Sequence, residues 1–102
     1  MDIAEKVLIQ PDPEIRHLVD GYLENVRRDL GAVGRGLEAG DLQKARSVGH
    51  ILKGTGASFD CGEITRLGGL LEEAAKSGDV AAARDRVQEL AAYVLRIEVA
   101  PS

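Results

Sequence analysis

His50 is surrounded, at helical spacing, by residues that could support chemistry at its imidazole ring. Arg46 stands four positions before it, Lys53 three positions after it and Gly54 four positions after it. Residues three and four apart share one face of an α-helix, so we expect all three to lie beside the histidine. A neutral imidazole offers a ring nitrogen as a nucleophile, and the two cations would stabilise negative charge brought to it.

The stretch from Leu42 to Phe59 is predicted to form the helix that carries this histidine. Its apolar and small positions repeat with helical spacing at Leu42, Ala45, Val48, Gly49, Leu52, Gly56 and Phe59. His50 lies about 140° from the centre of that stripe, so we expect it to face solvent. The two glycines of the stripe fall on the core face, where missing side chains let another helix approach closely. Gly54 and Ala57 fall on the exposed face, where their small size would give a partner protein access to the imidazole.

Helical periodicity also covers most of the remaining chain. The apolar spacing and turn signals predict four helices, at residues 12–37, 42–59, 63–77 and 80–99. Asp12 and Pro13 are typical of a helix start, and the first helix is either continuous and curved or broken at Asp20-Gly21. Gly40-Asp41 and Gly78-Asp79 each combine a left-handed stop with an N-cap for the next helix.

These elements predict an all-α protein, an antiparallel four-helix bundle with a short N-terminal arm or extra helix. Short turns between long amphipathic helices make sequence neighbours antiparallel. The composition agrees, since 44% of the residues are apolar and only 3% are aromatic, which favours aliphatic side chains on helices. We expect the 102 residues to form a single domain over 1–102, with residues 1–10 as a docking arm.

Charge and targeting signals argue against several classes of function. The net charge of −4 disfavours a nucleic-acid surface, which needs clustered Lys and Arg. The start carries no basic region followed by an apolar run, and no stretch of about 18 consecutive apolar residues occurs. We therefore expect a cytoplasmic monomer with no membrane partner, and the compact start and end suggest a standalone module. The single Cys61 cannot form an internal disulfide and fits a reducing compartment.

Two other kinds of site fit the sequence less well. A metal-binding bundle is the runner-up, but it would need paired Glu-x-x-His motifs and only Glu14/His17 occurs. Cys61 stands at a predicted turn with no histidine at fixed spacing, so we expect a packed or idle thiol rather than a nucleophile. We expect neither a metal site nor a cofactor in this chain.

The stretch from His50 to Gly56 resembles the HxLKG signature of histidine-containing phosphotransfer (Hpt) domains. A second stretch, with Leu67, Gly68, Leu71 and Glu72, resembles the helix that follows in that family. The resemblance implies that His50 is phosphorylated and carries the group between receiver-domain aspartates, or from a histidine kinase, in a two-component phosphorelay. It also implies that Lys53 pairs with phosphoryl oxygens and that Gly54 leaves room for the receiver. Catalysis and Mg²⁺ would belong to the partner, so the chain would be a phosphoryl carrier rather than an enzyme.

Asp60 departs from this pattern, because many family members have glycine ten residues after the histidine. Aspartate tolerates the left-handed conformation better than most residues, so we expect the turn there or, shifted by two, at Gly62. An alternative function keeps the bundle and its docking face but transfers nothing, as an interaction domain for receiver or kinase partners. The presence of His50, Lys53 and Gly54 together favours transfer.

Overall fold

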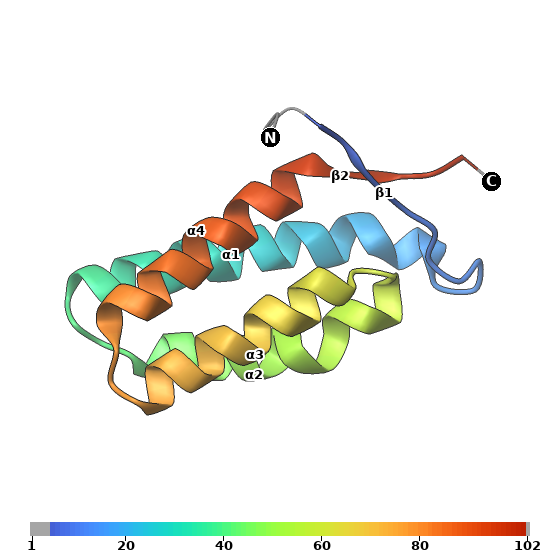
Figure 1. The fold of residues 1–102 in the computed structure, drawn as a ribbon. Coiled ribbons are helices and arrows are strands. Elements are labelled where there is room, and N and C mark those ends of the chain that lie inside the picture. The colour runs from blue at the N-terminus through green and yellow to red at the C-terminus, as the bar shows by residue number, and fades with distance from the viewer. Residues whose placement is uncertain (1–4, 102) are drawn as a thin grey trace.

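An antiparallel bundle of four helices fills the computed structural model, which describes residues 5–101 (Figure 1). The helices are α1 (Val19–Glu38), α2 (Gln43–Thr55), α3 (Gly62–Lys76) and α4 (Val80–Arg96). Each helix packs against the next along the chain, and α1 also packs against α4, so the four enclose one core. The predicted all-α four-helix bundle is confirmed.

Aliphatic side chains from all four helices build the core. Among those that are fully buried are Val33, Leu52, Ile64, Leu71 and Leu90. Burying one side chain of this size stabilises a fold by about 1.5 to 3 kcal/mol, so such a core needs few aromatic rings. The rings of Tyr22 and Phe59 stack at one end of the bundle with their centroids 4.3 Å apart. The Tyr22 hydroxyl also lies 2.9 Å from Thr55 Oγ1, which ties α1 to the end of α2.

Two glycine turns reverse the chain as the sequence predicted. Gly40 has φ 76° and Gly78 has φ 75°, so both take the left-handed conformation that ends a helix. Asp79 caps α4, because its Oδ1 accepts a hydrogen bond from the Ala82 backbone N–H at 2.9 Å. Asp41 differs from the predicted N-cap: its Oδ1 accepts from the Gln43 N–H at 2.9 Å, while Leu42 occupies the cap position.

The first helix begins later than predicted. Asp12 Oδ1 accepts from the Glu14 N–H at 2.9 Å, and the chain turns there instead of starting an α-helix. A short 3₁₀ helix, η1 (Arg16–Leu18), then leads directly into α1. From Val19 onward α1 is continuous through Gly21, so the alternative of a broken helix is wrong. Leu18, the last residue of η1, is 49% exposed.

The chain ends meet in a small parallel sheet that the sequence did not predict. Strand β1 (Val7–Ile9) pairs with β2 (Ile97–Val99), with Val7 opposite Ile97 and Ile9 opposite Val99 (Figure 1). The prediction that the last helix reaches Val99 is therefore wrong over three residues, where β-branched side chains favour the extended form. The first four residues of the predicted docking arm lie outside the described residues. Within 5–101, no helix is long and apolar enough to cross a membrane.

Candidate functional site

The helix that carries His50 is shorter than predicted. The α-helix α2 ends at Thr55, and the 3₁₀ helix η2 (Gly56–Phe59) completes the predicted stretch to Phe59. Asp60 follows with φ 60°, so aspartate takes the left-handed position expected of it. The Gln10 N–H donates to Asp60 Oδ2 at 2.8 Å, which fastens the N-terminal arm to this turn.

Glycines bring α2 and α3 unusually close together. A Cβ added to Gly49 would lie 2.6 Å from the Glu72 backbone N and 2.8 Å from the Gly68 carbonyl oxygen. On the facing helix, a Cβ added to Gly68 would lie 2.7 Å from Leu52 Cβ. Gly56 is equally tight, since its added Cβ would lie 2.6 Å from the Thr65 backbone N. The core-facing role predicted for Gly49 and Gly56 is confirmed.

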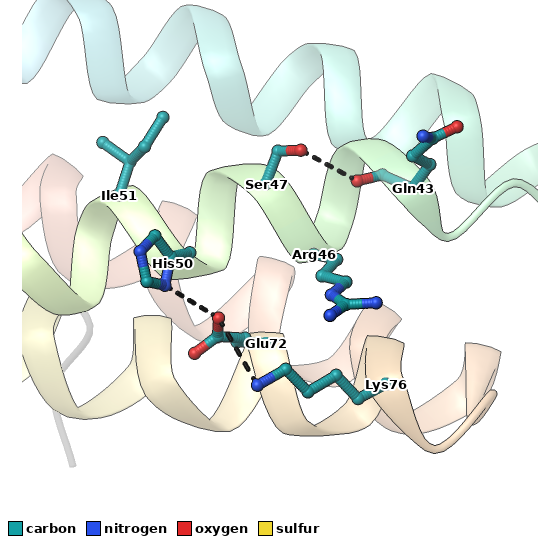
Figure 2. A pocket seen from close by; sticks show the side chains of 7 residues that line it. All are labelled: Gln43, Arg46, Ser47, His50, Ile51, Glu72 and Lys76. Atoms are coloured by element: carbon teal, nitrogen blue, oxygen red, sulfur yellow. Dashed lines mark hydrogen bonds and ion pairs between the residues drawn. The ribbon is translucent and has the colours of Figure 1, made fainter.

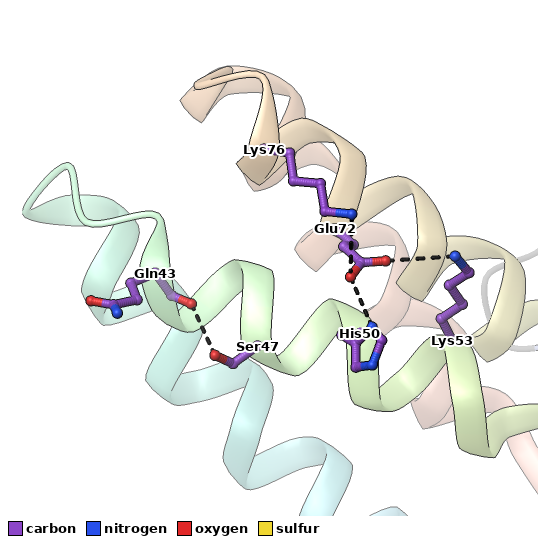
Figure 3. Close-up of polar contacts among 6 residues, drawn as sticks. All are labelled: Gln43, Ser47, His50, Lys53, Glu72 and Lys76. Atoms are coloured by element: carbon purple, nitrogen blue, oxygen red, sulfur yellow. Dashed lines mark hydrogen bonds and ion pairs between the residues drawn. The ribbon is translucent and has the colours of Figure 1, made fainter.

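His50 points outward from α2 and leans toward α3 (Figure 2). Its side chain is 75% exposed, and its Nδ1 lies 2.9 Å from Glu72 Oε2. An ionised carboxylate can only accept hydrogen bonds, so Nδ1 carries the hydrogen and donates. In the neutral form of the ring the lone pair lies on Nε2, which points away from Glu72 toward solvent (Figure 3). The site therefore exposes the Nε2 side of the imidazole ring.

Glu72 lies behind the imidazole and is itself only 4% exposed. Burial is the largest single effect and raises the pKa of this carboxyl, while the hydrogen bond from His50 and the charges of Lys76 and His50 lower it. With Lys53 adding to them, the net effect is a pKa below the usual value for glutamate. Glu72 is therefore ionised at neutral pH, as its role as acceptor for His50 requires.

Two lysines approach the same carboxylate from opposite sides (Figure 3). Lys53 Nζ lies 3.7 Å from Oε1, and Lys76 Nζ lies 3.7 Å from Oε2, the oxygen that also accepts from His50. Both contacts are longer than a hydrogen bond, so each ammonium is held by charge rather than by a directed bond. The stem of Lys53 runs over Gly69, where an added Cβ would lie 3.7 Å from the lysine Cγ and Cδ.

The remaining predicted site residues lie on α2 and η2. Arg46 is exposed and, with His50, Glu72 and Lys76, lines an open depression of about 660 Å³ (Figure 2). A Cβ added to Gly54 would meet nothing within 4 Å, so this position opens directly to solvent. Ala57 is exposed as predicted, although it belongs to η2 rather than to an unbroken α-helix.

Glu72 and Lys76 complete the site, yet the sequence pattern assigned neither of them a role. The available signal was the position of Glu72, which falls within the buried stripe of α3 between Gly68 and Ala75. A carboxylate on a buried helix face needs hydrogen bonds or cations around it. Lys76 follows four residues later on the same face and supplies one of those cations.

The rival site residues remain apart from this cluster. The Cys61 thiol is buried, and desolvation together with the charge of Asp60 raises its pKa to about 11, which disfavours the reactive thiolate. His17 is exposed in η1. Within the described part of the chain, no three side chains of the His, Cys, Asp and Glu types come together as a candidate metal site.

The four-helix bundle thus exposes one edge of the His50 ring and holds the other edge against a buried carboxylate. The model of the Hpt domain family matches residues 17–100, and the chain belongs to this family. Membership implies phosphotransfer in two-component signalling, and the family consists of phosphoryl carriers. Neither the curated proteins nor the solved structures contain a match to this chain.

Proposed function

We propose that His50 is the phosphorylated residue of this Hpt domain. It receives a phosphoryl group on Nε2 from a receiver-domain aspartyl phosphate or a histidine kinase, and passes it to another receiver aspartate. The observation that carries the proposal is the hydrogen bond from His50 Nδ1 to Glu72 Oε2, at 2.9 Å, combined with a 75% exposed ring. This pairing leaves Nε2 unprotonated and open to a partner.

The transfer step exchanges one bond for another. The Nε2 lone pair attacks the phosphorus of the aspartyl phosphate, an N–P bond forms, and the P–O bond to the aspartate breaks. The aspartate leaves as a carboxylate, while the ring keeps the hydrogen on Nδ1 and becomes positively charged. Glu72 lies against that hydrogen and stabilises the charge that develops on the imidazole, as a carboxylate does beside a catalytic histidine.

Lys53 supplies positive charge for the incoming group. Its side chain is 57% exposed and its contact with Glu72 is long, so the ammonium can turn from the carboxylate to the phosphoryl oxygens. Arg46 stands on the other flank of His50, in the depression described above, and adds to the positive potential there. Both cations favour the negative phosphoryl group over a neutral ligand.

Gly54 and Ala57 are proposed to admit the receiver. Gly54 has open space where a side chain would stand, and Ala57 adds little bulk in η2. An aspartate in a receiver is short, so the backbone around it must come close to Nε2 for in-line transfer. The receiver would bring its own Mg²⁺, and the charge on this chain's side of the reaction comes from lysine and arginine.

Labelling with a phosphorylated receiver tests this function, and the chain offers a matched control in its second histidine. The wild-type protein and His17→Gln are expected to acquire acid-labile, base-stable phosphate. His50→Gln is expected to acquire none. Mass spectrometry of peptides kept at alkaline pH would place the phosphate on the peptide that contains His50.

Two outcomes would contradict the proposal. Equal labelling of His50→Gln would place the phosphate elsewhere. Absence of label from every receiver and kinase tested, with binding to them retained, would support the alternative of an interaction domain that docks without transferring.

A further inference from the structure

Lys76 and His50 both contact the same carboxylate oxygen of Glu72. The phosphotransfer step proposed above assigns no role to Lys76. Lys76 Nζ and His50 Nδ1 both contact Oε2 of Glu72, at 3.7 Å and 2.9 Å. Lys53 contacts the other oxygen, Oε1, at 3.7 Å. The buried carboxylate is thus balanced by one cation on each side (Figure 3).

Phosphorylation disturbs this balance in two ways. If Lys53 turns toward the phosphoryl oxygens, Glu72 loses the cation beside Oε1. A phosphoryl dianion also arrives on the same imidazole whose other nitrogen Glu72 holds, so two negative groups flank one ring. Because Glu72 is only 4% exposed, water cannot replace the missing charge. The imidazolium and Lys53 together offset two of the three negative charges on the phosphoryl group and Glu72, so one further cation is needed while the histidine is phosphorylated.

We infer that Lys76 is a positioning residue, which stays on Glu72 when Lys53 leaves and so keeps the hydrogen bond to His50 Nδ1 in the phosphorylated state. Its place on α3 suits this task. Lys76 is four residues from Glu72 on the same helix, so its contact with the carboxylate does not depend on movement of α2. Lys53 is a residue of α2 near the histidine, where the phosphoryl group arrives. Lys53 thus moves from Glu72 to the phosphoryl group, while Lys76 stays in contact with Glu72.

The electrostatics of the unphosphorylated site agree with this division. The charged and titratable groups that face Glu72 are His50, Lys53 and Arg46 from α2 and Lys76 from α3. Among the lysines, Lys76 does more than Lys53 to lower the pKa of the Glu72 carboxyl. The inference rests on the proposed function of His50, because only a loaded histidine draws Lys53 away.

The test compares Lys76→Met with Lys76→Arg, and with Lys44→Met as a control on an exposed lysine outside the Glu72 cluster. The first readout is the equilibrium of phosphoryl exchange with a receiver. Lys76→Met is expected to shift it toward the receiver by about fivefold, equivalent to about 1 kcal/mol. Lys76→Arg and Lys44→Met are expected to resemble the wild type.

Two further readouts separate positioning from a direct or merely structural role. The ¹³C resonance of the Glu72 carboxyl should titrate at a higher pH in Lys76→Met than in the wild type, because a cation that lowers the pKa of this carboxyl is removed. In a Glu72→Gln background, the effect of Lys76→Met on the exchange equilibrium should disappear, because Lys76 acts through the carboxylate.

The inference is overturned if Lys76→Met leaves the exchange equilibrium and the Glu72 titration unchanged. It is also overturned if the effect persists in the Glu72→Gln background, which would mean that Lys76 touches the phosphoryl group itself. Failure of the proposed function is a different result, in which wild-type protein takes no phosphate. The Glu72 titration would still decide in that case whether Lys76 controls the carboxylate.

Discussion

Glycines at the contact between α2 and α3 pack against the neighbouring backbone, whereas Gly21 and Gly34 of α1 have open space beside them. Added Cβ atoms at Gly49 and Gly68 would lie under 3.0 Å from atoms of the facing helix. At Gly21 and Gly34 in α1, an added Cβ would meet nothing within 4 Å. Glycine thus allows close backbone contact between α2 and α3, but at these two positions of α1 it has no packing role.

The difference shows how the site is assembled. His50 stands on α2 and Glu72 on α3, and their hydrogen bond requires the two helix backbones to lie close together. Gly49, next to His50, and Gly68, one turn before Glu72, make that approach possible. Gly54 belongs to neither group: it lies on the site's helix, yet faces the open side where a partner would arrive.

Gly49→Ala is expected to have the largest effect, because its new methyl group would meet backbone atoms that cannot move aside. We expect a loss of about 3 kcal/mol in the free energy of unfolding, the upper end of the range for overpacked sites. Urea denaturation of the variant and the wild type measures it. A variant as stable as the wild type would mean that the helices separate easily and that the close contact is not required.

Gly54→Gln is expected to slow transfer while leaving the fold intact. The new side chain lies in open space, so helical circular dichroism should be unchanged, but it would stand between His50 and a receiver. We expect transfer to slow by about tenfold, equivalent to about 1.4 kcal/mol in the activation free energy. Gly54→Ala is the matched control and should slow transfer less. Unaltered transfer in Gly54→Gln would remove the access role proposed for this glycine.

Gly34→Ala is expected to have the smallest effect and the opposite sign. Its Cβ meets nothing within 4 Å, and alanine is the better helix former, so we expect a gain of about 0.5 to 1 kcal/mol in stability. Thermal or urea denaturation measures the gain, and phosphotransfer should be unaffected. A loss of stability would show that α1 needs this glycine for packing. The contrast between the glycines of α1 and those at the α2–α3 contact would then be wrong.

Local signals in the sequence predicted much of the fold. The turns at Gly40 and Gly78, the cap at Asp79 and the left-handed Asp60 depend on contacts within a few residues, and all are observed. The apolar periodicity likewise predicted the exposed face that carries His50. The prediction from apolar periodicity failed at the chain ends, where β1 pairs with β2, a strand about 90 residues away in the sequence. The β-branched Ile97 and Val99 favour an extended chain, but the helical apolar spacing continues through Ile97 and outweighed that signal in the prediction.

The sequence by itself determined the helices, their inward faces and the outward direction of His50, because each follows from spacing along one helix. Only the tertiary structure decided that Glu72 and Lys76 belong to the site. Glu72 is 22 residues from His50, and the two meet because of how α3 sits against α2. That register depends on backbone contacts at Gly49 and Gly68, which a one-dimensional pattern does not contain. A histidine is placed by its own helix, but its chemistry is tuned by the neighbouring one.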